Sequence, residues 1–310
     1  MFTRRSFFST AGLGLAAAGV AKFSANAAED SCAASSCPSA VTDYPYGNPA
    51  DTFRLGIAGF TFVKFKLDKA LQMMKKVDVH YLCIKDFHLP LTSDAAQIAA
   101  FHEQCKASDV MGYACGPIYM GSEEAAKNAF EYAKRCGVKT LVAVPFEMKN
   151  VPGKDKPQRV SSRKLLEYVD KLVKEYDIRY AIHNHGPDIP YLFPHAASAM
   201  EMIADLDKRI GLCLDIGHEL RFGTNPVDSF IKYHDRVYDI HLKNVTADNK
   251  SGCGTPLPRG KIDLLAFVKA LRKYRYTGMC SLEYETNMND PIVDIAECVG
   301  YFRGLMDATR

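Results

Sequence analysis

The stretch IRYAIHNHGPDIPYLFPHAASAMEMIADLDKRIGLCLD, residues 178–215, decides the fold. It contains two short apolar runs, 178–185 and 209–215, and each run ends in polar residues. Apolar side chains occur consecutively in these runs rather than at every second position. This pattern is typical of strands that are buried on both faces of a parallel sheet. The stretch therefore predicts one strand–helix–strand unit.

The same unit repeats along the chain. We expect further strands at 54–60, 79–85, 110–116, 138–147, 237–243 and 277–285. Between them apolar residues recur at helical spacing, as at Leu67, Ala70, Leu71 and Met74. Helix start signals agree, because Ser122, Ser162 and Asn225 precede such segments. Eight units near 30 residues apart, with no interrupting linker, predict an α/β fold: a (β/α)8 TIM barrel forming a single domain over residues 53–310.

The alternative is a doubly wound open sheet. That fold predicts a glycine-rich phosphate loop after the first strand, and residues 56–61, GIAGFT, do not supply one. The sequence also contains no P-loop and no G-x-S-x-G nucleophile elbow.

The N-terminus has the layout of an export signal. Residues 1–27 combine Arg4-Arg5, an Ala/Gly-rich apolar run and small residues at Ala25 and Ala27 that offer a cleavage site. The order Thr-Arg-Arg-Ser-Phe-Phe resembles the twin-arginine type of signal peptide, which predicts an exported, periplasmic protein. The apolar run is too short to span a bilayer, so we expect no stable membrane anchor. Residues 28–52 are expected to be a flexible linker. The sequence does not decide whether Cys32 and Cys37 within it form a disulfide.

The net charge of +3 over 310 residues is too small to indicate a nucleic-acid partner. Residues 1–27 hold three basic residues and no acid, so the rest of the chain has a net charge of 3 − 3 = 0. The other eight cysteines form no C-x-x-C pair and are interpreted as small buried side chains. We expect a small-molecule partner, and homo-oligomerisation stays open.

Polar residues end one predicted strand after another, and in a TIM barrel these ends converge on one mouth where active sites lie. Side chains alternate along a strand, so His183, Asp215, His241 and Glu283 are expected to face inward at similar height. Two imidazoles and two carboxylates make a mixed nitrogen and oxygen site for one divalent metal ion: Mn²⁺, Co²⁺, Zn²⁺ or Mg²⁺. Further candidates at strand ends are Lys85, Glu147, His185, His218 and Lys243.

Some of these residues also have simpler interpretations. Asp215 alone is compatible with a helix cap, and His241 alone with a hydrogen-bonded core histidine. Lys243 could pair with a neighbouring carboxylate, and Glu285 is expected to face only the rim. The sequence does not decide whether His183 or His185 is the metal ligand.

Together these residues resemble the xylose isomerase-like TIM barrels, the sugar phosphate isomerase/epimerase group. Relatives in this group are keto-sugar 3-epimerases, inosose dehydratases and dehydroshikimate dehydratases. The resemblance covers residues 53 to about 308, and its carriers are IHNHG (182–186), LDIGH (214–218), DIHLKN (239–244), PRGKID (258–263) and SLEYE (281–285).

The resemblance implies that His183, Asp215, His241 and Glu283 hold the metal, although many relatives have a Glu where this chain has His183. It makes His185 and His218 substrate contacts and places Arg259 or Lys261 near the substrate. The implied activity is sugar isomerisation or epimerisation through an enediolate. Glu147 or Glu283 is the expected proton acceptor, while Lys85 and His185 stabilise the oxyanion or return a proton.

Export favours a non-phosphorylated keto-sugar as substrate. The same enediolate allows a hydratase or dehydratase, that is, a lyase, acting on a 3-keto-sugar. Two further classes are less well supported by the sequence. An abasic-site endonuclease-like protein requires a basic groove, and residues 53–310 contain no block of positive charge. A non-catalytic sugar-binding barrel would leave Glu147, Lys85 and Glu283 without a role.

Overall fold

The computed structural model describes residues 45–310. The predicted signal peptide at 1–27 and the cysteine pair Cys32 and Cys37 lie outside the described residues. Among the described helices, none is both long enough and apolar enough to cross a membrane.

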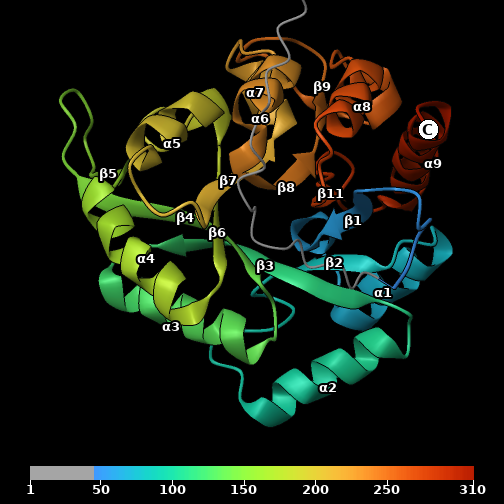
Figure 1. The fold of residues 1–310 in the computed structure, drawn as a ribbon, viewed down its shortest axis with the longest axis horizontal. Coiled ribbons are helices and arrows are strands. Elements are labelled where there is room, and N and C mark those ends of the chain that lie inside the picture. Colours follow the sequence, from blue (N-terminus) through green and yellow to red (C-terminus); the bar gives the residue numbers. More distant parts are fainter. Residues whose placement is uncertain (1–44) are drawn as a thin grey trace, which may run out of the picture. The chain divides into compact units, whose positions relative to one another are not determined.

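Eight parallel strands close into a barrel, as predicted (Figure 1). Each strand pairs in parallel with its neighbour in the order β3-β2-β1-β11-β8-β7-β6-β4, and pairing of β3 with β4 closes the ring. Their bounds are β1 Arg54–Ala58, β2 Tyr81–Ile84, β3 Met111–Met120, β4 Thr140–Lys149, β6 Arg179–His183, β7 Ile210–Asp215, β8 Val237–Leu242 and β11 Met279–Leu282.

Helices connect the strands and form the outer layer of the barrel (Figure 1). They are α1 Leu67–Lys76, α2 Ala95–Lys106, α3 Glu123–Arg135, α4 Arg163–Tyr176, α5 Ala196–Ile203, α6 Ile216–Arg221, α7 Pro226–Tyr233, α8 Leu264–Lys273 and α9 Ile292–Ala308. The expected caps are present: the side chains of Ser122, Ser162 and Asn225 accept backbone N–H bonds at the starts of α3, α4 and α7.

Two short additions depart from eight plain units. β5 (Gln158–Ser161) pairs antiparallel with the end of β4, so that β4 continues past the barrel as a two-stranded ribbon. β9 (Asn244–Val245) and β10 (Gly254–Thr255) form a second small antiparallel pair after β8. Both additions follow the carboxyl ends of barrel strands, so both lie at the mouth.

The barrel interior is filled by side chains from its strands. One buried cluster, formed by Tyr81, Cys83, Tyr113, Ala114, Val142, Ala181, Cys213 and Met279, draws on six of the eight strands and therefore lies inside the ring. Most of the remaining core lies between the strands and the helices. Seven of the eight cysteines in the described part are buried, as expected, and Cys253 is exposed.

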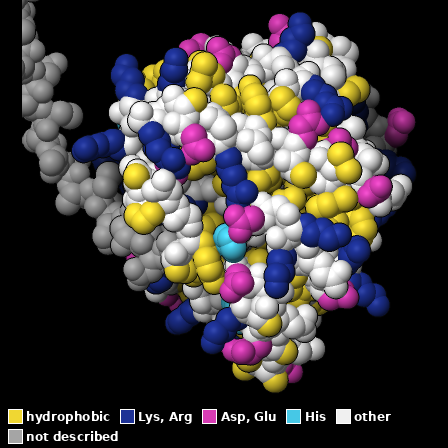
Figure 2. Space-filling view, turned by 90° about the vertical axis from the view of Figure 1, so that its right-hand side faces the viewer, with side chains coloured by type: hydrophobic (Ala, Val, Ile, Leu, Met, Phe, Trp, Pro, Cys, Tyr) yellow, Lys and Arg dark blue, Asp and Glu magenta, His cyan; other side chains and the backbone are white. Residues whose placement is uncertain are grey.

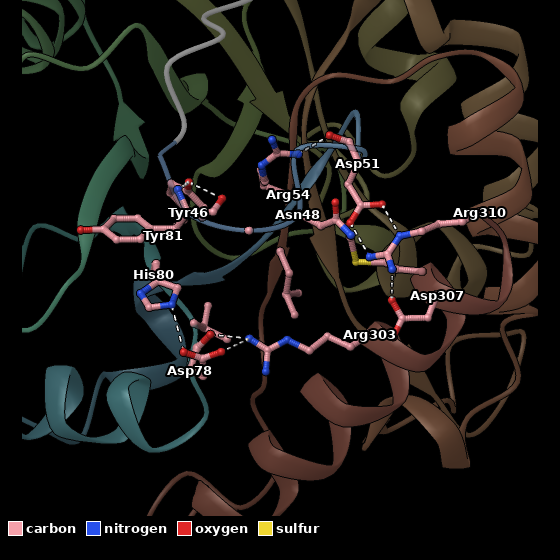
Figure 3. A pocket seen from close by; sticks show the side chains of 14 residues that line it. Tyr46, Asn48, Asp51, Arg54, Asp78, His80, Tyr81, Arg303, Asp307 and Arg310 are labelled. Atoms are coloured by element: carbon pink, nitrogen blue, oxygen red, sulfur yellow. Dashed lines mark hydrogen bonds and ion pairs between the residues drawn. The ribbon is translucent and has the colours of Figure 1, made fainter.

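At the opposite end of the barrel, residues from the start and the end of the described chain line a pocket (Figure 3). Asp51 is buried and pairs with Arg272 and Arg310, so the last residues of the segment expected to be a linker pack against the barrel. A cavity of about 170 Å³ lies beside this contact, and Arg303 pairs with Asp78 in its wall. These pairs lie at the amino ends of the strands, the end of a TIM barrel that serves stability rather than catalysis.

Candidate metal and substrate site

Four buried side chains meet at the carboxyl ends of neighbouring strands. His183 ends β6, Asp215 ends β7, His241 lies in β8, and Glu283 follows β11. Asp215 and His241 are direct partners in the register between β7 and β8, so their side chains point to the same side of the sheet. One ligand atom from each of the four residues lies within 4.8 Å of the other three. The inward convergence predicted from strand parity is therefore present.

The distances within this group suit a single cation. His183 Nε2 lies 3.1 Å from His241 Nδ1, 3.6 Å from Asp215 Oδ2 and 3.7 Å from Glu283 Oε2, and His241 Nδ1 lies 3.2 Å from Glu283 Oε2. Ligands held at about 2.0–2.2 Å from one ion are separated from each other by about 3 to 4 Å. The four atoms thus fit the coordination shell of one divalent metal ion.

Asp215 uses its two oxygens differently. Oδ1 accepts the backbone N–H of His218 at 2.8 Å and so caps α6, as the simpler interpretation of this residue predicted. Oδ2 is buried and accepts no hydrogen bond of good geometry. Its polar neighbours are the Lys243 ammonium at 3.1 Å and the His183 ring nitrogen at 3.6 Å, so this oxygen faces the cluster and is free to bind a metal ion. Asp215 is therefore a helix cap and a candidate ligand at once.

Lys243 adds a positive charge to the group. Its ammonium nitrogen lies 3.1 Å from both Asp215 Oδ2 and Glu283 Oε2, and 2.7 Å from Glu285 Oε2. Burial alone would lower the pKa of Lys243, but the surrounding carboxylates, Asp215 first, raise it well above its usual value. Lys243 is therefore held as an ammonium ion, and it does pair with neighbouring carboxylates, the simpler interpretation offered by the sequence.

The same electrostatics act on the histidines. Burial would lower the pKa of His183, but hydrogen bonds to Asp215 and Glu283 raise it to about 9. His183 is thus protonated near neutral pH while no metal ion is bound. A metal ion would take the place of that proton, because ligand histidines must be neutral.

Asn184, between the two histidines of the IHNHG motif, fixes the adjoining loops. Its side-chain oxygen accepts the N–H of Asp215 at 2.8 Å, and its amide donates to the Asp215 carbonyl at 3.1 Å and to Glu219 at 3.2 Å. Glu219 also accepts bonds from Ser229 Oγ and the N–H of Ala196. This buried network orients Asp215, and sequence reasoning assigned Asn184 and Glu219 no role.

His185 lies beside the group, but both of its ring nitrogens are engaged. Nδ1 lies 3.1 Å from the carbonyl oxygen of His183, which can only accept, so Nδ1 carries the proton. Nε2 then accepts from the hydroxyl of Tyr119 at 2.5 Å. His183 is therefore the residue that enters the cluster, and the hydroxyl of Tyr119, a half-exposed residue at the end of β3, stands between His185 and the solvent.

A cavity of about 150 Å³ opens beside the cluster and is lined by His218, Lys243, Glu283, Glu285 and the β9–β10 pair. His218 Nε2 lies 3.8 Å from Asp215 Oδ2 and 3.4 Å from Lys243 Nζ. Glu285 was expected to face only the rim. It reaches the cavity because Lys243 draws its carboxylate inward. Burial raises the pKa of Glu285, although Lys243 opposes this effect.

Glu147 and Lys85 do not line this cavity. Glu147 lies on the ribbon and pairs with Lys149 at 2.8 Å. Its neighbour Phe146 contacts Tyr119 on the mouth side, so alternation turns Glu147 to the other face. Lys85 pairs with Asp86 and donates to the Pro117 carbonyl.

The loop 258–263 directs its basic side chains away from the cluster. Arg259 pairs with Glu297 of α9 and is largely exposed. Lys261 is exposed as well, and it meets the β9 strand only through its backbone N–H, which donates to Val245. Neither residue lines the cavity.

The fold and the site define a class: a closed (β/α)8 barrel with a buried His/Asp/His/Glu group at its mouth. The chain belongs to the Xylose isomerase-like TIM barrel family, whose sequence pattern matches residues 58–299. This agrees with the resemblance drawn from the motifs. A search of curated proteins finds no significant match.

Solved structures share the fold at low sequence identity. A D-tagatose 3-epimerase-like protein is 15% identical with a TM-score of 0.64, and the match covers 83% of this chain and 99% of that one. The IOLI protein with a bound zinc atom is 17% identical with a TM-score of 0.63, over 83% and 99% of the two chains. A probable 3-DHS dehydratase, AsbF, from Bacillus anthracis is 12% identical with a TM-score of 0.63, over 80% and 99%.

Proposed function

We propose that this protein is a divalent-metal-dependent sugar isomerase or epimerase that acts on a non-phosphorylated keto-sugar. The observation that carries the proposal is the group of four buried ligand atoms, one from each residue, within 4.8 Å of one another. Support comes from the family, and from neighbours in fold whose names include an epimerase, a dehydratase and a zinc-binding protein.

His183, Asp215, His241 and Glu283 would hold the metal ion, which supplies Lewis-acid polarisation of a substrate carbonyl and hydroxyl. The chain's own residues must then move a proton. Removal of a C–H proton beside the carbonyl leaves an enediolate, and the ammonium of Lys243 faces the place where its negative charge develops. His218 lines the same cavity and is placed to bind a substrate hydroxyl.

Glu285 replaces Glu147 as the proton acceptor in this proposal. It is the carboxylate outside the ligand set that lines the cavity, and it is about one third exposed. A general base must come within hydrogen-bond reach of the proton that it takes, and Glu285 lines the cavity whereas Glu147 does not. Proton return to the opposite face of the same carbon gives an epimer, and return to the neighbouring carbon gives an isomer.

The alternative function is a lyase that adds or removes water on a 3-keto-sugar. It shares the first proton transfer and differs in expelling a β-hydroxyl, which needs a proton donor on the leaving side. The cationic Lys243 beside Glu285 is such a donor. The probable dehydratase among the neighbours in fold gives this alternative its support.

Export to the periplasm and a small sugar as partner remain part of the proposal. On the face of the barrel in Figure 2, side chains of both charge signs are interspersed without a block of one sign, which favours a small-molecule partner over a nucleic acid. A nucleic-acid partner would require a concentrated basic surface. Homo-oligomerisation is left to a measurement of molecular mass in solution.

The test is exchange of substrate protons with deuterium. Keto-sugars are incubated with the mature protein in D₂O, and exchange at the carbon beside the carbonyl is followed by NMR, with chelator and after metal is added back. The proposal expects exchange that stops with chelator and returns with metal. Exchange that is absent from every keto-sugar, or that survives complete metal removal, contradicts it. Product identity separates epimer, isomer and dehydrated sugar.

A further inference from the structure

The β4–β5 ribbon places an arginine beside the proposed site. Arg159 lies in β5, and its guanidinium carbon is 4.7 Å from the centre of the Tyr119 ring and 5.1 Å from the centre of the Phe146 ring. The two rings meet edge to face with centres 6.5 Å apart. Arginine stacks readily on aromatic faces, and this leaves the N–H donors at its edge available.

Arg159 differs from the other arginines of the mouth in its partners. Arg163 is held by Asp205, Arg221 by Asp188, and Arg259 by Glu297. Within residues 45–310 no carboxylate and no carbonyl accepts a hydrogen bond from Arg159, whose side chain is exposed. Its position is therefore fixed by two rings, while its hydrogen-bonding capacity is unused by the protein.

A short series of contacts joins Arg159 to the metal-ligand group. The Tyr119 ring under its guanidinium hydrogen-bonds to His185, with ring centres 5.5 Å apart, and the His185 ring lies 4.8 Å from that of His183. Two side chains, those of Tyr119 and His185, thus connect Arg159 to the ligand His183.

The ribbon is anchored and basic. The N–H of Ser161 donates to the Tyr191 carbonyl, and Ser161 Oγ accepts the N–H of Phe193, so the base of β5 is tied to the loop after β6. Residues 147–159 carry four basic and two acidic side chains, a net charge of +2, in a chain that is neutral after residue 27. A local positive potential beside a cavity attracts anions.

We propose that Arg159 binds an anionic group on the substrate, so that the natural substrate is a sugar acid or another sugar carrying a carboxylate. This inference rests on the proposed function for the position of the sugar, and it adds the chemical class of that sugar. The carboxylate would receive the paired N–H donors of the guanidinium, whose plane the two rings hold in place.

The test is calorimetric binding to the metal-loaded mature protein. The probes are D-glucuronate, D-glucose and D-glucose 6-phosphate. The variants are Arg159→Gln, which keeps the ribbon but removes the charge, and Lys156→Gln, which removes one charge elsewhere on the ribbon. Glucuronate is expected to bind about tenfold more tightly than glucose to the wild type and to Lys156→Gln, and equally to glucose in Arg159→Gln.

Equal binding of glucuronate and glucose by the wild type overturns the inference. So does a glucuronate preference that survives in Arg159→Gln, because it would then come from the metal ion or from general charge. A preference for the phosphate over glucuronate that depends on Arg159 would overturn the carboxylate assignment. Deuterium exchange is measured separately. If the wild type shows no deuterium exchange but prefers glucuronate through Arg159, the proposed function alone is refuted. If the wild type shows exchange but binds glucuronate and glucose equally, this inference alone is refuted.

Discussion

His183 Nε2 and His241 Nδ1 lie 3.1 Å apart, and both nitrogens face the carboxylates of Asp215 and Glu283. At most one proton can occupy the space between the two nitrogens. The raised pKa of His183, about 9, shows that the group attracts a positive charge at this point. A divalent ion satisfies both imidazoles and both carboxylates at once, which a single proton cannot do.

Replacing Lys243 by Met separates metal binding from catalysis. The ammonium lies 3.1 Å from oxygens of both carboxylate ligands and repels a metal ion there. Lys243→Met is expected to bind divalent metal at least about tenfold more tightly. Proton exchange should fall about 100-fold, because the charge facing the enediolate is lost. Metal titration and deuterium exchange check the two effects, and weaker metal binding in this variant would contradict the assigned position of the lysine.

The choice of proton acceptor is tested by two matched carboxylates. Glu285→Gln should lower the exchange rate by about 100-fold or more while metal stoichiometry is kept, since a general base contributes about 10²–10⁴. Glu147→Gln is the control, because that side chain pairs with Lys149 on the outer face of the ribbon. Its exchange rate should match that of the wild type. The reverse result, an inactive Glu147→Gln beside an active Glu285→Gln, would restore the sequence-based choice.

Stability should depend on pH through Glu219. Burial raises the pKa of this carboxyl from 4.5 to about 7, although Ser229 and the Ala196 N–H oppose the shift. A raised pKa in the folded state means that the stabilisation is complete below pH 4.5 and is lost as the pH rises toward 7. The loss is on the order of 3 kcal/mol. Urea unfolding of the metal-free protein from pH 4 to 8 measures it.

Glu219→Gln supplies the comparison for that curve. Its amide keeps an acceptor for the Ala196 N–H, and Ser229 can turn to accept from its NH₂ group. The variant should lose less stability than the wild type between pH 4.5 and 7. Parallel curves for the two proteins would show that Glu219 does not carry this pH dependence.

A helix cap gives a smaller and local effect. Ser162 is buried, and its side chain accepts the N–H of Leu165 at the start of α4. Ser162→Ala should lower the free energy of unfolding by about 1 kcal/mol. The midpoint of urea unfolding checks this, and metal stoichiometry should be unchanged because α4 supplies no ligand.

The sequence predicted the barrel and its ligand group because both depend on local signals. Consecutive apolar residues mark each strand, and parity alone directs His183 and Asp215 inward. Glu147, predicted at the site, does not line the cavity, because pairing of β4 with β5 extends the strand past the barrel and nothing in β4 itself reveals that partner. The same cause hid Arg159, which reaches the mouth only through this ribbon.

Other site features depend on contacts between distant segments. Tyr119 meets His185 across 66 positions of sequence, and no local pattern connects them. Glu285 was expected to face only the rim because it lies two residues beyond Glu283, but its bond to Lys243 holds it beside the cavity. Asn184 lies within the IHNHG motif, between the two histidines. Its side-chain amide can both donate and accept, and this was the one sequence signal of its bonds to the Asp215 backbone.

The most direct test of the metal centre is the metal content of Asp215→Asn. This variant keeps an oxygen that can cap α6 while removing the charge of the proposed ligand. Asp263→Asn is the matched control, since Asp263 caps α8 in the same manner away from the cluster. Elemental analysis of purified protein after dialysis should find one divalent ion per chain in the wild type and in Asp263→Asn, and almost none in Asp215→Asn. A full equivalent of metal in Asp215→Asn, or none in the wild type after metal is supplied, would contradict the assignment.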